Sequence, residues 1–161
     1  RRPWGPEVRV LLQRVTRAAV RIEGEVVGSC GPGLLILLGV GRDDDTTLAA
    51  SVAGRVADLR IFRDEAGRTN RSLLEVGGQA LVVSQFTLYA DTRKGRRPSF
   101  LDAAPPELAI PLYERFTAEL EARGVTVGRG IFGAEMEVEL VNDGPMTIWL
   151  DNQAREADRL G

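Results

Sequence analysis

The strongest constraint on the fold of this chain is a pair of short, apolar runs. Gly33–Val40 (GLLILLGV) holds no charged or polar side chain, and Gln79–Leu88 is also strongly apolar. Runs of this length are short for helices and suit strands that are buried on both faces. They predict a sheet at the centre of the core. With 161 residues, the chain can bury roughly two-thirds of its unfolded surface without disulfides or a structural metal.

Two other segments repeat apolar residues at helical spacing. Thr46–Leu59 follows Asp43-Asp44-Asp45, which can supply an N-cap, and its apolar face is Leu48, Val52, Val56 and Leu59. Pro105-Pro106 opens a second helix that runs to about Arg123, with Leu108, Leu112, Phe116 and Leu120 at fourfold spacing. The sequence therefore predicts two amphipathic helices.

Shorter alternating segments predict the remaining strands. Glu23-Gly24 is a hairpin signal, and Asn142–Pro145 is expected to be a tight turn between the two last strands. The predicted strands are Val8–Val15, Ala18–Ile22, Glu25–Ser29, Arg60–Phe62, Met136–Val141 and Met146–Leu150, besides the two apolar runs. These strands and helices together predict an α/β fold with a mixed sheet and two main helices.

One domain, residues 8–151, accounts for these elements. Residues 1–7 are interpreted as a non-native or disordered leader and 152–161 as a polar, frayed tail. No apolar run approaches the ~18 residues that a bilayer requires, so no membrane partner is expected. Cys30 is the one cysteine, which excludes an internal disulfide and fits a reducing, cytoplasmic location.

Histidine is absent from the chain, and this limits its chemistry. Ser-His-Asp and Cys-His mechanisms are excluded. With one cysteine and no histidine, a zinc site is not expected, and no other metal or cofactor is predicted. Cys30 is interpreted as a small structural residue, because no histidine can activate its thiol.

Three polar segments are candidates for function. Ser84-Gln85-Phe86-Thr87 ends an apolar strand, where unpaired polar groups would be costly; an ordinary strand with one solvated face is the alternative. Asp91–Ser99 is predicted to be an exposed loop, whose Arg93, Lys94, Arg96 and Arg97 either contact phosphates or are simply solvated. Asn142–Thr147 surrounds Gly144-Pro145, where a plain turn is the alternative.

Five motifs, in order from about Val8 to Leu150, resemble those of the D-aminoacyl-tRNA deacylases. They are Gln13-Arg14-Val15, Ser84–Leu88, Gly95–Phe100, Phe132-Gly133-Ala134 and Asn142–Thr147. Each motif is weak alone, but five in order are specific. The resemblance implies a barrel-like α/β core and a homodimer whose site lies across the subunit interface. Aminoacyl-tRNA is the implied partner, with its 3′-terminal adenosine in the site.

The resemblance also implies roles for particular residues. Ser84 and Gln85 match the family's Ser-Gln pair on the site strand. Gly144-Pro145 matches a Gly-cis-Pro motif that reaches into the partner's pocket. Phe132 and Met136 match the region of the adenosine pocket, and the effect of Glu135 there stays open.

The expected reaction is hydrolysis of the ester between a D-amino acid and tRNA. Backbone N–H groups of Phe86 and Thr87 could stabilise the oxyanion, and the ribose 2′-hydroxyl could orient water. A covalent mechanism with Thr87 as the nucleophile ranks second, because the sequence shows no base that could deprotonate its hydroxyl. Carbonyl groups at Gly144-Pro145 would hold the α-ammonium, so that an L side chain strikes backbone. Achiral glycine should pass, which makes glycyl-tRNA formed on tRNA(Ala) a further expected substrate.

Two alternatives from other classes remain. One is a non-catalytic nucleic-acid-binding module that uses the Arg93–Arg97 loop alone. The other is a small-molecule esterase, which the missing nucleophile–base pair disfavours.

Overall fold

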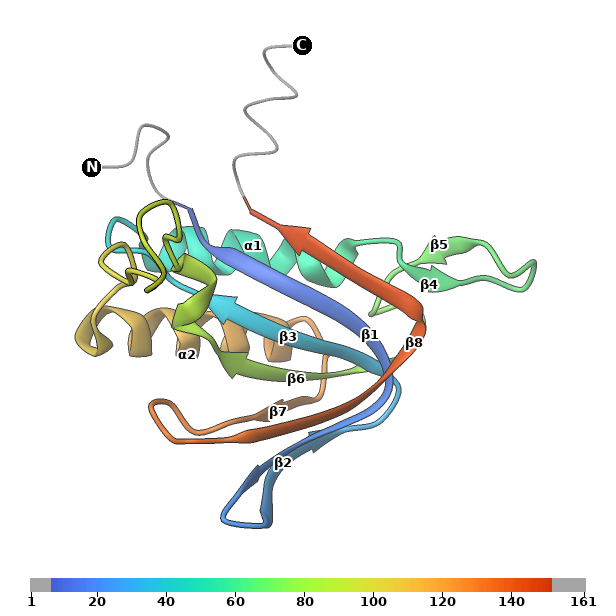
Figure 1. Cartoon of the computed structure of the whole chain (residues 1–161). Helices are drawn as coiled ribbons and strands as arrows, with labels where there is room; N and C mark the ends of the chain where they lie inside the picture. The colour runs from blue at the N-terminus through green and yellow to red at the C-terminus, as the bar shows by residue number, and fades with distance from the viewer. Residues whose placement is uncertain (1–6, 152–161) are drawn as a thin grey trace.

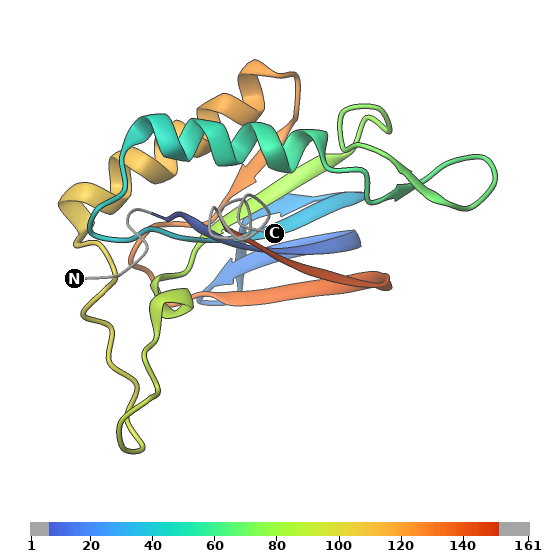
Figure 2. The ribbon, with the colours of Figure 1, turned by 90° about the horizontal axis from the view of Figure 1, so that it is seen from above.

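A mixed sheet forms the centre of the molecule, and two helices cover one of its faces (Figures 1 and 2). The computed structural model describes residues 7–151. The strands of the main sheet are β1 (Arg9–Ile22), β2 (Glu25–Cys30), β3 (Gly33–Gly39), β6 (Gln79–Ser84), β7 (Val127–Arg129) and β8 (Glu137–Leu150). Their order is β2-β1-β3-β6-β7, and β8 pairs with β1.

The remaining elements are two helices, a single 3-10 turn and a small projecting hairpin. They are α1 (Thr46–Asp58), α2 (Pro106–Ala122), the 3-10 helix η1 (Phe86–Tyr89), and the hairpin β4 (Phe62–Arg63) and β5 (Thr69–Arg71). Both predicted helices are confirmed. The Asp45 carboxylate caps α1 by accepting from the N–H of Leu48 at 2.8 Å. Among residues 7–151, no helix is both long and apolar enough to cross a membrane.

Two hydrophobic cores lie on opposite faces of the central strands. Leu34, Ile36 and Leu38 point from β3 toward the helices. Leu35 points the other way, into a smaller core with Val15, Val20, Leu81 and Val83. Alternate residues of one strand thus enter both cores, which explains why the runs on β3 and β6 are apolar throughout.

The smaller core is enclosed because the sheet curls until β2 approaches β7. At Gly28, a Cβ would lie 2.0 Å from the carbonyl oxygen of Arg129, so this position requires glycine. The result is the nearly closed, barrel-like sheet that the sequence and its family resemblance predict.

Several sequence predictions need correction. The first two predicted strands are one strand, β1, and the last two are likewise one strand, β8. The turn predicted at Asn142–Pro145 is therefore wrong, because these residues continue β8 alongside β1, at irregular positions of the ladder. Gln79–Leu88 is a strand only to Ser84, after which the chain forms η1. The sequence analysis missed β5 and β7.

The described chain begins one residue before the predicted domain boundary. Glu7 is fully buried and accepts a hydrogen bond from Arg9 Nε at 2.7 Å. Residues 1–6 of the predicted leader and the predicted tail, 152–161, lie outside the described residues.

Candidate active site

The polar segment Ser84–Thr87 begins where β6 leaves the core. Leu38 of β3 pairs with Ser84, and the N–H of Gln85 donates to the Leu38 carbonyl at 2.8 Å. From Gln85 onward the chain turns into η1. The buried strand thus carries its polar residues to one edge of the sheet, where Ser84 and Gln85 are half-buried and Phe86 and Thr87 are exposed.

A close contact and a buried network hold η1 against this edge. Gly39 permits the approach, since a Cβ there would lie 3.2 Å from the Gln85 carbonyl oxygen. Arg9 donates to the Leu88 carbonyl at 2.8 Å, and its guanidinium lies 4.2 Å from the ring centroid of buried Tyr89. Arg9 and Tyr89 therefore position the site backbone. Sequence reasoning missed both, because nothing local links them to Ser84.

The first turn of η1 supplies two backbone donors, and both residues that carry them, Phe86 and Thr87, are exposed. The N–H groups of Phe86 and Thr87 start a helix, so they have no partner within it. The Gln85 amide donates to Thr87 Oγ1 at 2.6 Å. In the described chain no carboxylate is hydrogen-bonded to Thr87. The geometry supplies donors for a developing negative charge and shows no base for the Thr87 hydroxyl.

Phe132 and Met136 lie near the same edge, because β7 runs parallel to β6 and ends beside it. The N–H of Gly130 donates to the Val82 carbonyl at 3.2 Å. Both side chains are half-buried: Phe132 packs on the larger core and Met136 on the smaller. Glu135 between them is exposed.

The basic loop is exposed, as the sequence predicts, and it projects away from the helices (Figure 2). Paired backbone bonds of 2.8 Å between Asp91 and Ser99 close its base. Hydrogen bonds from Arg93 lower the pKa of the Asp91 carboxyl to about 2. Lys94, Arg96 and Arg97 form no ion pair with any residue between 7 and 151, so the four cations are not equivalent.

Gly144-Pro145 lies in the middle of β8, level with the start of β3, whereas Ser84 lies level with the end of β3. Val15 pairs with both Asn142 and Gly33, whereas Leu38 pairs with Ser84. At ~3.3 Å per residue and ~4.8 Å per strand, this places Gly144 roughly 13 Å along and 14 Å across from Ser84. The Gly144-Pro145 peptide bond is cis. One chain therefore does not bring these two motifs together.

Buried and half-buried polar side chains hold the Gly144-Pro145 segment in place. Arg14, 4% exposed, donates from Nε to the Asp143 carbonyl at 3.1 Å and from Nη1 to the Ile61 carbonyl at 2.7 Å. The Asn142 amide donates to the carbonyls of Arg14 and Met146 at 2.9 and 3.0 Å. Arg14 and Asn142 belong to two of the five family motifs, but the sequence did not indicate that they position this segment.

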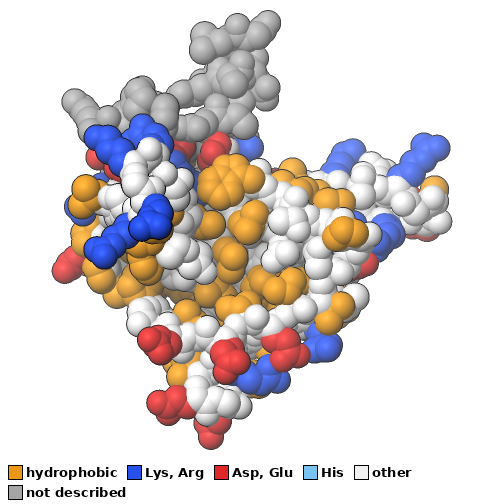
Figure 3. All heavy atoms as spheres, in the orientation of Figure 1, with side chains coloured by type: hydrophobic (Ala, Val, Ile, Leu, Met, Phe, Trp, Pro, Cys, Tyr) orange, Lys and Arg blue, Asp and Glu red, His pale blue; other side chains and the backbone are white. Residues whose placement is uncertain are grey.

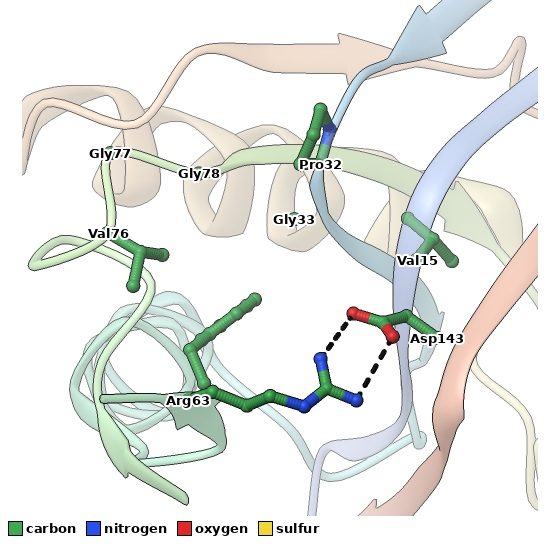
Figure 4. A pocket seen from close by; sticks show the side chains of 9 residues that line it. Val15, Pro32, Gly33, Arg63, Val76, Gly77, Gly78 and Asp143 are labelled. Carbon is green, nitrogen blue, oxygen red and sulfur yellow. Dashed lines mark hydrogen bonds and ion pairs between the residues drawn. The ribbon is translucent and has the colours of Figure 1, made fainter. Parts of the chain in front are cut away.

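A pocket of about 350 Å³ opens beside this segment (Figure 4). Arg63 from β4 and Asp143 from β8 meet across it in two hydrogen bonds of 3.0 and 3.2 Å. The other lining residues are Val15, Pro32, Gly33, Phe62, Val76, Gly77 and Gly78. The ion pair ties the β4–β5 hairpin to the Gly144-Pro145 segment.

Cys30 takes no part in either region. It is buried in the smaller core, and burial raises the pKa of its thiol. This agrees with the structural role that the sequence predicts. Across residues 7–151, no three His, Cys, Asp or Glu side chains gather where they could hold a metal ion.

Known proteins are similar to this chain in both sequence and fold. The family model described as D-Tyr-tRNA(Tyr) deacylase matches residues 11–151. The D-aminoacyl-tRNA deacylase of Thermomicrobium roseum is 62% identical over 145 residues, covering 90% of this chain and 94% of that protein. That of Roseiflexus castenholzii is 61% identical over 145 residues, covering 90% and 92%.

Two solved structures have the same fold. One, described as a c-Myc DNA unwinding element binding protein, superposes with a TM-score of 0.83 at 37% identity, over 88% of this chain and 97% of its own. The other, described as a probable eukaryotic D-amino acid tRNA deacylase, gives 0.80 at 20% identity, over 90% and 99%. At that identity the second supports the fold alone.

The barrel-like α/β fold, the polar strand end and these relatives define an ester hydrolase that acts on aminoacyl-tRNA. More closely, the chain belongs to the D-aminoacyl-tRNA deacylase family, whose members remove D-amino acids from tRNA. The family predicted from the five motifs is confirmed.

The Asp143 carboxylate generates a prediction about pH. Hydrogen bonds from Arg63 hold the pKa of Asp143 below its ordinary value of 3.8, and Arg14 adds to the effect. A lowered folded-state pKa stabilises the fold above pH 3.8 and loses this effect as pH falls through the folded-state value. Asp143→Asn should therefore cost about 1 kcal/mol at pH 7, since the group is partly exposed. Below pH 3.8 that difference should shrink.

Urea unfolding of both proteins across this range measures the effect. Glu65→Gln is the matched control, because Glu65 lies on the same hairpin, is 80% exposed, and within residues 7–151 forms an ion pair with Arg71 alone. A difference that stays constant down to pH 2 would contradict the ion-pair account.

Proposed function

We propose that the protein hydrolyses D-aminoacyl-tRNA, spares the L ester, and does so in a site completed by a second subunit. The observation that carries the proposal is the position of Ser84–Thr87. A buried strand delivers a polar, partly exposed turn to one edge of the sheet, and the first two backbone N–H groups of that turn have no partner within η1. Those groups can stabilise the oxyanion of ester hydrolysis without histidine. Phe132 and Met136, beside the same edge, are proposed to contact the terminal adenosine.

The distance between Ser84 and Gly144 supports a homodimer. Gly144-Pro145 is exposed on β8, and it can serve a Ser84 site only if that site belongs to another copy. β8 also exposes Val138, Val141 and Trp149, and apolar side chains gather on the sheet face that the helices leave open (Figure 3). Burying such a face between two copies would be favourable.

Selectivity would follow from backbone at the partner's Gly144-Pro145. Gly144 has a φ of 129°, and its missing side chain lets the segment approach a bound amino acid. If carbonyl groups there hold the α-ammonium, an L side chain meets backbone and a D side chain points to solvent. Glycine, with no side chain, would pass. We propose the cytoplasm as the place of action, because aminoacyl-tRNA is found there.

Purified protein should release D-Tyr from D-Tyr-tRNA much faster than L-Tyr from the L ester, and should also release glycine from glycyl-tRNA(Ala). Release of labelled amino acid over time measures all three. Equal rates on the D and L esters would refute the chirality claim.

The 37%-identical structure described as a c-Myc DNA unwinding element binding protein favours a second candidate, a non-catalytic nucleic-acid-binding module. Binding of tRNA without any release would support that candidate.

The basic loop, residues 91–99, should contact the tRNA backbone through Lys94, Arg96 and Arg97, which form no ion pair within the described part of the chain. Log affinity falls as log salt rises, and Arg96→Ala should make this negative slope shallower by about 0.7–0.9, the contribution of one phosphate contact. Arg93→Ala is the matched control and should change the slope less, because Arg93 is already bonded to Asp91. Binding of tRNA at about 50–200 mM salt measures both slopes. Equal slopes for Arg96→Ala and the wild type would make the loop a solvated surface.

Thr87→Ala separates the two mechanisms, because it removes the hydroxyl and keeps the backbone N–H. The variant should keep substantial activity if backbone donors and the ribose 2′-hydroxyl carry the reaction. A substrate with a 2′-deoxy terminal adenosine should lose much more. Single-turnover rates provide the comparison, with circular dichroism to check the fold. Abolished activity in a folded Thr87→Ala protein would support covalent catalysis.

Mixed dimers test whether Gly144 acts on the partner's site. At Gly144, a Cβ would lie 2.6 Å from Arg14 Nη2, so Gly144→Ala must displace either the segment or the Arg14 guanidinium that holds it. A small misplacement can cost ~100-fold in rate. A Gly144→Ala subunit paired with a Gln85→Ala subunit leaves one site with both defects and one intact. About half the wild-type activity per heterodimer should return. Heterodimers that form but stay inactive would show that the motif does not act across the interface.

A further inference from the structure

Two exposed aromatic rings lie side by side at the edge that carries the candidate site. Phe86 is 55% exposed and Phe100 is 36% exposed, and their ring centroids are 5.0 Å apart at an angle of 73°. Large apolar side chains left in water at a functional edge are the kind of feature that a partner covers. The reaction does not use these rings, since the proposed oxyanion donors are backbone groups.

The backbone on both sides fixes the position of this aromatic pair. Phe86 is the first residue of η1, which Gly39 and Arg9 hold against the sheet. Phe100 directly follows Ser99, whose N–H and carbonyl both bond to Asp91 at 2.8 Å. The rings are therefore presented at a set distance from the N–H groups of Phe86 and Thr87.

The loop that precedes Phe100 is positively charged. The loop that leads to Phe100 carries Lys94, Arg96 and Arg97, none of them in an ion pair within residues 7–151. Aromatic rings beside unpaired cations match a single-stranded nucleic acid, whose bases stack while its phosphates meet the cations. A purely apolar protein partner would leave the three cations unused.

We propose that the Phe86–Phe100 pair is a stacking platform for the unpaired nucleotides that precede the terminal adenosine of tRNA. The proposal rests on the proposed function, because it assumes that the ester lies at Phe86 and Thr87. From that point the strand would leave across Phe86 and Phe100 toward Arg96 and Arg97. The platform reads no particular base, since every base has a stacking face.

Two substrates separate the platform from the reaction centre. D-tyrosyl-adenosine carries the ester but no preceding nucleotide, and D-Tyr-tRNA carries both. Phe100→Leu keeps apolar bulk and removes the ring. It should raise KM for D-Tyr-tRNA at least about fivefold, which corresponds to about 1 kcal/mol of stacking. It should leave kcat/KM for D-tyrosyl-adenosine unchanged, and Phe100→Trp should restore the wild-type KM.

Leu101→Ala is the matched control, because Leu101 is the next residue, is 75% exposed and has no ring. It should change neither substrate's kinetics. An equal loss on both substrates for Phe100→Leu, or no loss on either, would overturn the platform. A weaker dimer in sedimentation of Phe100→Leu would also overturn it, since the ring would then belong to an interface between copies.

A binding measurement keeps the inference testable if the protein hydrolyses nothing. The probe is an uncharged RNA oligonucleotide that ends in CCA, with pyrrolo-cytosine in place of the cytosine next to the adenosine. Stacking on the rings should quench its fluorescence with the wild type and Phe100→Trp but not with Phe100→Leu. Equal quenching by all three proteins would refute the platform, whereas failure of ester release alone would refute only the proposed function.

Discussion

β3 and β6 pair in parallel over six residues of each strand, from Gly33 with Gln79 to Leu38 with Ser84. Both strands are buried from two sides, by the helices on one face and the smaller core on the other. A parallel pair requires a long crossover, and α1 together with the β4–β5 hairpin fills it. Because the strands end together, η1, the segment after β7 and the basic loop all gather at one edge.

The same sheet separates the Ser84–Thr87 segment from Gly144-Pro145, the two segments that we propose act in one site. The edge after β6 offers the N–H groups of Phe86 and Thr87, a pair of exposed rings, and three cations that form no ion pair within residues 7–151. The other segment, Gly144-Pro145, is held by Arg14, Asn142 and the Arg63–Asp143 ion pair. A rigid sheet cannot bring these two segments together, so the site that we propose requires a second copy of the chain. Arginine positions the backbone in both regions, through Arg9 at η1 and Arg14 at the Gly144-Pro145 segment. A guanidinium group carries several N–H donors and can therefore bond to more than one backbone carbonyl.

Particular elements show how far the sequence could be read. The helices α1 and α2 were predictable because their apolar faces repeat at helical spacing, and Asp45 marks a start. β7 was not predicted, because a strand of three residues that includes one glycine and one arginine has no recognisable strand pattern. Ser84–Thr87 stood out as a polar strand end, but the change to η1 after Ser84 depends on contacts with Gly39 and Arg9, which lie far away in the sequence. Asn142–Pro145 has the composition of a turn, yet pairing with β1 keeps it within one strand.

The sequence by itself determined the buried strands, the two helices, the exposed basic loop and, through five ordered motifs, the family. Each of these depends on residue types at short spacing, where local propensity and burial agree. Only the tertiary structure decided that Arg93 is bound to Asp91 while Arg96 has no ion pair within residues 7–151, that Phe86 meets Phe100, and that Gly144 lies far from Ser84. Register, ion-pair choice and the curl of the sheet set these relations. They arise from contacts between residues that are distant along the chain, and no local pattern encodes them.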